Sequence, residues 1–561
     1  MPPHLHGEDA EGMFLSVTSG NVHRFPWAAG NDAQILIVQM GSKSTPTIKE
    51  LLMKIGFRSR VVGWRELPDV WARQDLKPNL VILSGGEQSV YDPDAPGMSA
   101  ELFRAIIRES VILGICYGAQ LLAQLGGGEV RKAAKPEVGM VDVRVKSPLG
   151  HYKGGTVVMN HGDEIVRMPA DWKVVGSTQD CAHALCVSPR AVAVQFHPEM
   201  DHTEGGNHLL KYVAKAIADC RTDFSFQPST FITEAGRWLR ETIPTGHVVC
   251  GASAGVDSTS ALLIGRQAYG TRIHGVYVDN GLMREGETDE ARGIYGAAGM
   301  TYVDAREVFY DALEAIPYPA DGRPAQRESA YFKEVRAVVG KTFIEVFARQ
   351  TRVMELPFRA LMQGTNRADI VESETGLKAH HNVGALPLRL MEEFGLDVIE
   401  PLADLFKYQV REVAEALGLP EEVARRQPFP GPGLSLRLWG KIDRSIFPPL
   451  ARANRILHEV VVKHYPAFNR RPHQYYAAFM PLPSVGIMGD GRVSGYGWWI
   501  RLVSARNREN YSSIGNFLAS AKFYAELTQR LTTETRMPDG TPFIRVAQEM
   551  TPKPPSTTEL H

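Results

Sequence analysis

The sequence predicts an α/β protein with two doubly wound parallel-sheet domains, followed by a C-terminal α+β domain. Short strands that are apolar throughout alternate with helical segments over most of the chain, which is typical of sheets buried on both faces. Two turns rich in small residues, at 114–118 and 253–258, each follow such a strand and open a helix. The last part of the chain mixes strands and helices without this alternation.

Length and composition limit the class of protein. The chain has 561 residues, of which 44% are hydrophobic, and its net charge is −1. Three or four domains are expected because one core does not grow to this size. The balanced charge offers no basic field for nucleic acid, and no apolar run of about 18 residues predicts a membrane span. We therefore expect a cytoplasmic protein without nucleic-acid or membrane partners.

Five cysteines stand at positions 116, 181, 186, 220 and 250. They include no C-x2-C pair and do not form an even-numbered set with the spacing of a disulfide framework. They therefore indicate reduced thiols rather than disulfides or a zinc site. Only Cys116 has surroundings that suggest chemistry, and the other four are expected to be structural.

The first domain is expected at 33–223, after a loose and polar N-terminal extension at 1–32. A helix is predicted at 46–55, with Thr45 as its N-cap and a proline at the first helical position. Its predicted strands are apolar and short, at 35–38, 81–83, 111–115 and 191–194. Because parallel strands end at one edge of a sheet, the residues that follow them are expected to form the site.

The second domain is expected at 224–427 and repeats the alternation. Its first predicted elements are a helix, a strand, a helix and a strand, at 233–241, 248–250, 259–268 and 273–278. Residues 315–328 contain three prolines and are expected to form a loop.

A third domain is expected at 428–561. Residues 427–433 hold three prolines and two glycines, which mark either a boundary or a rigid ligand loop. Strands are predicted at 474–482 and 498–503, and a helix at 516–531.

The turn at 114–120 carries a candidate nucleophile, Cys116, between two glycines. A thiol attacks as the thiolate, which a helix N-terminus and a nearby imidazole favour, and the glycines permit a strained elbow. The run Gln195-Phe196-His197-Pro198-Glu199 follows another strand, so His197 is the candidate base and Glu199 the residue that orients it. Backbone N–H groups of the Gly85-Gly86 turn and of Tyr117 are expected to face the oxyanion.

This pattern resembles the class I glutamine amidotransferases, which release ammonia from glutamine with a Cys-His-Glu triad. The resemblance implies that Cys116 forms a glutamyl thioester, that His197 shuttles the proton, and that Glu199 holds the imidazole. It also implies glutamine contacts at Gly86, Tyr117, Gln120, Asn160, His161 and Asp163. Position 160 is usually serine in that family, so backbone contacts are expected there.

The second turn, Ser253-Ala254-Gly255-Val256-Asp257-Ser258-Thr259, offers backbone N–H groups at a helix N-terminus, which form an anion cradle. It lacks the Gly-Lys-Ser/Thr ending of a P-loop and resembles the Ser-Gly-Gly-x-Asp-Ser loop of N-type ATP pyrophosphatases, which yield AMP and pyrophosphate. The resemblance implies that this loop binds ATP and that Asp257 helps to hold Mg²⁺. Ala254 replaces a family glycine, and a positive φ there costs on the order of 1 kcal/mol.

Further segments resemble the GMP synthetases, in order along the chain. They lie at 278–282, 363–365, 369–373, 380–384, 428–434, 484–492 and 553–555. That family joins a glutaminase, an ATP pyrophosphatase and a dimerisation domain, and it adenylates the O2 of XMP before ammonia displaces AMP to give GMP. The resemblance implies glutamine, ATP and XMP as ligands, Mg²⁺ as cofactor, and a homodimer.

The same resemblance assigns further binding residues. It places ATP contacts at Val278 and Gly364 and a lid at 380–382. A nucleoside monophosphate needs fixed cations, which arginine and lysine supply. The implied XMP contacts are Arg336, Pro430, Gly431, Asp490, Arg492, Lys553, Thr558 and Glu559.

The C-terminal region departs from the sequence that is usual in this family at 493–510 and at 557–561. Two interpretations remain open: divergence among ordinary GMP synthetases, or a specialised paralogue that aminates a related purine nucleotide. A non-catalytic regulatory homologue is a third alternative, and it is expected to have lost Cys116, His197 or Asp257, all of which are present. A tRNA-modifying enzyme with a similar loop needs a basic surface or metal-binding cysteines, which the sequence does not favour.

Overall fold

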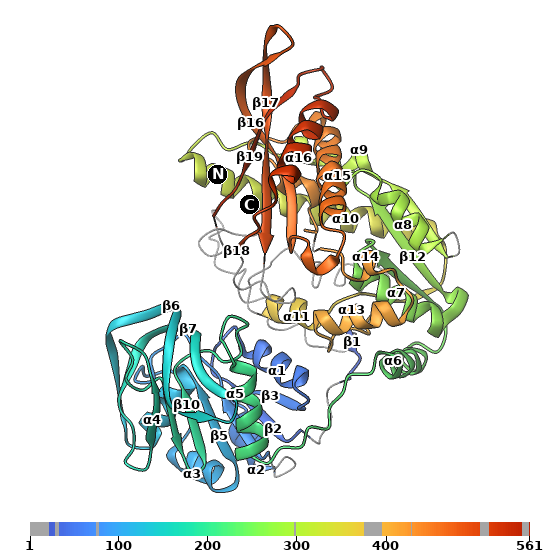
Figure 1. The fold of residues 1–561 in the computed structure, drawn as a ribbon. Coiled ribbons are helices and arrows are strands. Elements are labelled where there is room, and N and C mark those ends of the chain that lie inside the picture. Colours follow the sequence, from blue (N-terminus) through green and yellow to red (C-terminus); the bar gives the residue numbers. More distant parts are fainter. Residues whose placement is uncertain are drawn as a thin grey trace, which may run out of the picture. The chain divides into compact units, whose positions relative to one another are not determined.

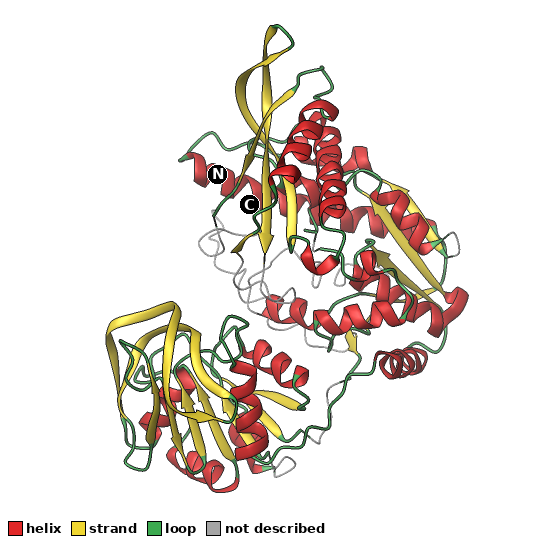
Figure 2. Cartoon of the chain, in the orientation of Figure 1, coloured by secondary structure: helices red, strands yellow, loops and turns green. Residues whose placement is uncertain are grey.

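The computed structural model describes residues 22–27, 33–73, 78–296, 299–374, 395–427, 429–504, 515–551 and 560. The chain forms two compact units, one built mainly of residues 27–227 and the other of 1–26 with 228–505 and 514–561. Figures 1 and 2 show the elements of each unit. No helix in the described ranges is long and apolar enough to cross a bilayer.

The unit of residues 27–227 is built on a nine-stranded sheet of order β3-β2-β4-β5-β10-β9-β8-β6-β7 (Figure 1). Its parallel strands are β3 Ser59–Gly63, β2 Ile35–Gln39, β4 Leu80–Leu83, β5 Val111–Ile115 and β10 Ala191–Val194. Ile35 and Ile37 pack into one core while Leu36 and Val38 pack into another. The strands are apolar throughout because both faces of the sheet are buried. The predicted parallel α/β fold is confirmed.

The other four strands of this sheet are antiparallel, and the sequence did not predict them. They are β9 Leu185–Ser188, β8 Lys173–Ser177, β6 Glu129–Leu149 and β7 Tyr152–Arg167. Figure 2 shows the length of the β6–β7 pair. The side chains of β6 are largely exposed, Val138 to 74%, and those of β7 alternate between buried and less buried positions, so neither strand is apolar throughout.

Helices cover this sheet. They are α1 Thr45–Lys54, α2 Leu67–Ala72, α3 Ala100–Glu109, α4 Tyr117–Leu125 and α5 Gly206–Tyr212, which continues into a π-helical turn at Val213–Ile217. The helix predicted at 46–55 is present, but its N-cap is Ser44 rather than Thr45. The side chain of Ser44 points instead to the site described below.

The second unit contains a six-stranded sheet of order β1-β15-β14-β11-β12-β13, parallel throughout. The strands are β1 Val22–Arg24, β15 Asp397–Glu400, β14 Phe358–Met362, β11 His247–Ala252, β12 Ile273–Asp279 and β13 Met300–Asp304. Strand β1 differs from the loose extension expected at 1–32. It pairs with β15, and Arg24 Nε donates to Glu400 Oε2 at 2.8 Å. Three residues are too few for a sequence pattern to reveal.

The helices of this part are α6 Pro228–Thr242, α7 Val256–Tyr269, α8 Glu287–Tyr295, α9 Arg306–Glu314, α10 Pro324–Val353, α11 Arg367–Glu374, α13 Lys407–Ala416 and α14 Glu421–Ala424. The loop expected at 315–328 is wrong from Pro324 onward, because this proline begins α10. Proline fits the first turn of a helix, where its missing N–H has no partner to lose.

The C-terminal part is α+β, as predicted. Its strands are β16 Gln474–Met488, β17 Gly491–Ser504, β18 Gly515–Asn516 and β19 Phe543–Gln548, and its long helices are α15 Phe447–His464 and α16 Ala521–Glu534. One hydrophobic core contains Val276 of β12, Leu457 of α15 and Trp498 of β17. The six-stranded sheet and the C-terminal elements are therefore packed as one body, and a separate third domain stays a prediction.

Candidate active site

The nucleophile elbow lies where β5 passes into α4. Cys116 has φ 51°, a left-handed conformation that costs a non-glycine residue about 1–3 kcal/mol. A Cβ atom on Gly118 would lie 2.3 Å from the carbonyl oxygen of Leu83, so only glycine lets the elbow approach β4 this closely. The cysteine is 6% exposed and is the N-cap residue of α4.

The predicted triad is assembled in the structure. His197 Nδ1 lies 2.8 Å from Glu199 Oε1, and both side chains are buried. Burial alone would lower the pKa of His197, but the charge of Glu199 and contacts with Glu199 and the Cys116 thiol raise that pKa well above its usual value. The imidazole is thus held ready to carry a proton beside the sulfur.

Sequence reasoning missed Ser44, whose hydroxyl donates to Glu199 Oε1 at 2.7 Å. The serine follows β2, so it lies at the same sheet edge as the nucleophile. Ser44 and His197 share one carboxylate oxygen, which fixes the orientation of Glu199.

The predicted oxyanion turn lies against the triad. A Cβ on Gly85 would be 3.3 Å from His197 Cε1, and one on Gly86 would be 3.0 Å from the Tyr117 ring. Gly86 and Tyr117 are therefore neighbours beside the thiol, as a two-donor oxyanion hole requires. Their role in binding glutamine stays a prediction.

The segment at 160–163 lies on β7 and partly surrounds the thiol. The carbonyl oxygen of Asn160 is 3.7 Å from Cys116 Sγ. Gln120 Nε2 donates to the Asp163 carbonyl at 3.1 Å and to Gln195 Oε1 at 3.3 Å. The backbone of Asn160 thus faces the sulfur, whereas Gln120 links two strands under the site.

The carboxylate of Asp163 organises the loop before α3. It accepts hydrogen bonds from the Ser89 hydroxyl at 2.6 Å and from the Tyr91 hydroxyl at 2.8 Å. In this structure Asp163 therefore shapes one wall of the site. A direct contact between Asp163 and glutamine stays a prediction.

Glu199→Gln is expected to lower the pKa of His197. The variant removes the carboxylate charge that raises this pKa, while the burial that lowers it remains. Glutamine hydrolysis is expected to fall by roughly 10²–10⁴-fold. The pKa of His197 in the folded protein exceeds its value of about 6.5 in the unfolded chain. Protonation of His197 therefore stabilises the wild-type fold. This stabilisation is complete below about pH 6.5 and is lost as the pH rises through the pKa of the folded protein. NMR titration of His197 and unfolding measured against pH check both effects.

Glu204→Gln is the matched control for that variant, since Glu204 contacts the backbone of Thr156 rather than the imidazole. An unchanged pKa of His197 in Glu199→Gln would contradict the assignment of Glu199 as the charge that raises it.

The second predicted site lies between β11 and α7. Ser253 N donates to Ser258 Oγ at 3.1 Å, and the two hydroxyl oxygens are 3.0 Å apart. Thr259, predicted to contact phosphate, is instead fully buried and donates to the Gly255 carbonyl at 2.7 Å. Its hydroxyl therefore holds the loop, while Ser253 and Ser258 remain more accessible.

Ala254, which replaces the family glycine, has φ 54°, so it bears the cost that a positive φ carries at this position. Its N–H donates to the hydroxyl of Tyr295 at 3.1 Å, and that hydroxyl also contacts Thr259 Oγ1 at 2.8 Å. Burial raises the pKa of Tyr295, which keeps the hydroxyl protonated. Tyr295, which the sequence did not suggest, thus stabilises a strained loop.

Asp257 lies in the first turn of α7 and forms an ion pair with Lys407 of α13. Its other oxygen lies 3.4 Å from Asn366 Nδ2. Gly364 lies against the same turn, because a Cβ there would be 2.6 Å from the Asp257 carbonyl carbon. The structure thus brings two segments of the predicted ATP site together and adds Lys407, which sequence reasoning missed. Val278 lies near the carboxyl end of the adjacent strand β12.

The predicted XMP residues are spread over separate elements. Arg336 lies on α10, Pro430 and Gly431 precede the 3₁₀ turn Gly433–Leu436, and Asp490 and Arg492 stand exposed at the β16–β17 turn. The predicted XMP contacts Lys553, Thr558 and Glu559, like the predicted lid at 380–382, lie outside the described residues. The XMP site stays a prediction.

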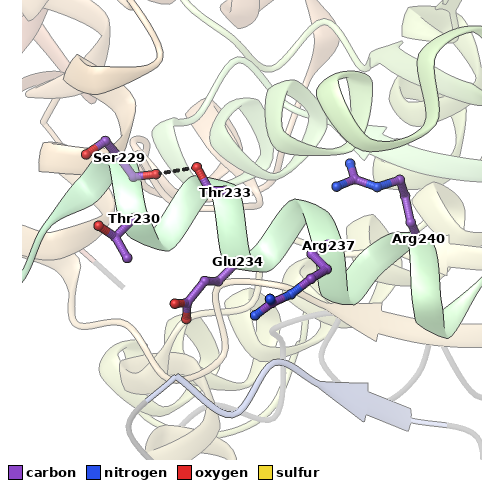
Figure 3. A pocket seen from close by; sticks show the side chains of 6 residues that line it. All are labelled: Ser229, Thr230, Thr233, Glu234, Arg237 and Arg240. Carbon is purple, nitrogen blue, oxygen red and sulfur yellow. Dashed lines mark hydrogen bonds between the residues drawn. The ribbon is translucent and has the colours of Figure 1, made fainter.

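A recess also lies along one side of α6, lined by Ser229, Thr230, Thr233, Glu234, Arg237 and Arg240 (Figure 3). Thr233 Oγ1 donates to the Ser229 carbonyl at 2.9 Å. None of the predicted site residues lines this recess, so it is not part of the candidate active site.

Comparisons with known proteins agree with these two sites. A model of the class I glutamine amidotransferase family matches residues 36–216. A glutamine-hydrolysing GMP synthase of Thermus thermophilus is 35% identical over 538 residues, covering 94% of this chain and 99% of the relative. Relatives of the same name from Maridesulfovibrio salexigens and Candida albicans are 32% and 34% identical, each over 94% of this chain and over 99% and 96% of their own lengths.

The family predicted from the motifs is confirmed, since these relatives match 94% of the chain at 32–35% identity. The chain belongs to the family of glutamine-hydrolysing GMP synthases.

Proposed function

We propose that this chain makes GMP from XMP, with ammonia from glutamine and energy from the cleavage of ATP to AMP and pyrophosphate. The assembled triad of Cys116, His197 and Glu199, in a chain whose relatives are glutamine-hydrolysing GMP synthases, carries the proposal. The intact triad also disfavours a non-catalytic regulatory homologue, which has no need to keep a buried charge pair and a strained cysteine.

At the first site, the Cys116 thiolate attacks the amide carbon of glutamine. The oxyanion that forms is stabilised by backbone N–H groups near Gly86 and Tyr117. The amide C–N bond then breaks, and His197 gives its proton to the departing ammonia. Water, deprotonated by His197, cleaves the resulting thioester to release glutamate and restore the thiol.

At the second site, the loop of Ser253 and Ser258 receives the phosphates of ATP at the N-terminus of α7. The O2 of XMP attacks the α-phosphorus and pyrophosphate leaves, after which ammonia attacks C2 and AMP leaves with the oxygen. Lys407 places a fixed positive charge beside this loop.

Asp257 fits a magnesium ion, because it is a partly exposed carboxylate and hard oxygen ligands suit this ion. Mg²⁺ would neutralise charge on the pyrophosphate leaving group. Asp257 would hold it while Lys407 and Asn366 orient the carboxylate.

Release of pyrophosphate with ATP, Mg²⁺ and glutamine tests the nucleotide, with XMP compared against IMP and other purine monophosphates. Turnover only with XMP is the expected result. Turnover with another purine nucleotide and not with XMP would instead identify a specialised paralogue. The departures at 493–510 would then be the first candidates for its specificity.

The proposed homodimer forms through the C-terminal part. The β16–β17 pair exposes Leu482 to 62%, Val485 to 58% and Ile487 to 77%. Grouped apolar side chains of this size on one hairpin support a protein contact there.

Ile487→Glu is expected to weaken the dimer by on the order of 10-fold or more, because it places a charge in an apolar contact. Sedimentation velocity over a range of protein concentrations measures the effect. The control is Val308→Glu, at an exposed valine on α9. A wild-type protein that is monomeric, or a dimer that Ile487→Glu leaves unchanged, would refute an interface at this hairpin.

A further inference from the structure

Three buried donor side chains lie together in the amidotransferase unit, outside the triad. They are Glu137 on β6, His161 on β7 and Cys181 between β8 and β9. One ligand atom from each lies within 4.8 Å of the others, and all three residues are at most 6% exposed. The pairing of β6 with β7 places Glu137 directly opposite His161.

The hydrogen bonds fix which nitrogen of His161 is free to bind. His161 Nδ1 lies 2.9 Å from the carbonyl oxygen of Asp163, which can only accept, so Nδ1 carries the proton. In the neutral ring Nε2 then presents a lone pair, and it lies 3.4 Å from Glu137 Oε2. Neither of these two buried atoms has a hydrogen-bond partner. Two buried acceptors that face each other are unfavourable unless a proton on Nε2 or a bound cation lies between them.

A threonine orders the other two ligands. Thr178 Oγ1 donates to Glu137 Oε1 at 2.6 Å, which leaves Oε2 directed at the cluster. The same hydroxyl accepts from the backbone N–H groups of Asp180 and Cys181, at 3.2 and 2.8 Å. A polar group that orients metal ligands in this way is usual around protein metal sites.

We propose that Glu137, His161 and Cys181 bind a divalent transition-metal ion, and that the ion is zinc. Sulfur, nitrogen and carboxylate oxygen are the donors that zinc takes in proteins. The separation of 3.4 Å between His161 Nε2 and Glu137 Oε2 matches two ligands of one tetrahedral ion, which stand about 3.3 Å apart at the usual bond lengths.

Zinc binding displaces the thiol proton of Cys181 to solvent, because a metal takes the thiolate. The spacing of these residues along the chain contains no zinc motif. The β6–β7 register pairs Glu137 with His161, and the segment between β8 and β9 adds Cys181.

The site also bears on the nucleophile. Asn160 precedes His161 on β7, and its carbonyl oxygen lies 3.7 Å from Cys116 Sγ. A metal that holds His161 therefore fixes the strand that faces the reacting sulfur.

Cobalt titration of metal-stripped protein tests the site, because a cobalt–thiolate bond gives a charge-transfer absorption band. The parent protein carries Cys116→Ala, so that the catalytic thiol cannot bind the ion. We expect one equivalent of Co²⁺ with a thiolate band, which zinc displaces. Adding Cys181→Ser is expected to abolish the band, whereas the control Cys186→Ser, at another buried cysteine, keeps it.

Two further variants test the site even if the Cys181→Ser protein does not fold. Glu137→Gln removes a ligand charge and is expected to weaken cobalt binding by about 10-fold or more while the band remains. Thr178→Val is expected to weaken it by roughly 10–100-fold. The proposal is overturned if the parent shows no thiolate band, if the band survives in folded Cys181→Ser, or if Glu137→Gln binds as tightly as the parent.

Discussion

Replacing Cys116 with alanine is expected to abolish glutamine-dependent GMP formation and to leave ammonium-dependent formation intact. The sulfur lies beside the base and at the N-terminus of α4, so its loss removes the thioester route. Glutamine-dependent turnover is expected to fall by roughly 10⁴-fold or more. Parallel assays with glutamine and with ammonium chloride measure the two routes.

Cys220→Ala is the matched control, because Cys220 is another buried thiol of the same unit, and its sulfur lies 4.0 and 3.9 Å from the carbonyl oxygens of Gln34 and Ala218. Both routes should survive in that protein. If Cys116→Ala kept its glutamine-dependent rate, another nucleophile would have to be sought. Loss of the ammonium route as well would mean that the variant damages more than the glutaminase chemistry.

Gly364→Ala is expected to slow adenylation on the order of 10²-fold while glutamine hydrolysis continues. The added Cβ would lie 2.6–2.7 Å from the Asp257 carbonyl group and the Ser258 nitrogen, so the loop must move. Such overpacking costs about 1–3 kcal/mol, and displacing a substrate-binding loop lowers rates on the order of 10²-fold. Pyrophosphate release and glutaminase activity, measured separately, distinguish the two sites.

Gly340→Ala is the control for this change. Gly340 lies within α10, where an added Cβ meets nothing within 4 Å, so alanine is expected to raise stability by about 1 kcal/mol. Normal pyrophosphate release from Gly364→Ala would show that the turn at Asp257 does not receive ATP.

The strands and the nucleophile were predictable because their signals are local. Ile35 to Val38 are apolar without interruption, and Cys116 stands between glycines directly after such a strand. Each of these features depends on residues that are neighbours in the sequence, so the local sequence pattern is enough to predict it. The positive φ at Ala254 was likewise predictable, since a family glycine marks the position.

The remaining features depend on contacts between distant segments. Lys407 reaches Asp257 from 150 residues away, and Ser44 reaches Glu199 from 155 residues away. Glu137 and His161 meet only through the register of β6 and β7, and neither strand is apolar throughout. Such partners follow from topology, which periodicity and spacing along the chain do not determine.

Transfer of an isotopically labelled amide nitrogen from glutamine to XMP tests the central claim most directly. The protein is incubated with ATP, Mg²⁺, XMP and the labelled glutamine, and the purine product is analysed by mass spectrometry. We expect GMP that carries the label on its exocyclic amine, formed together with AMP and pyrophosphate in equal amounts. Two results would contradict the proposed reaction. In one, glutamine is consumed while XMP stays unchanged, and in the other, a different nucleotide is aminated instead of XMP.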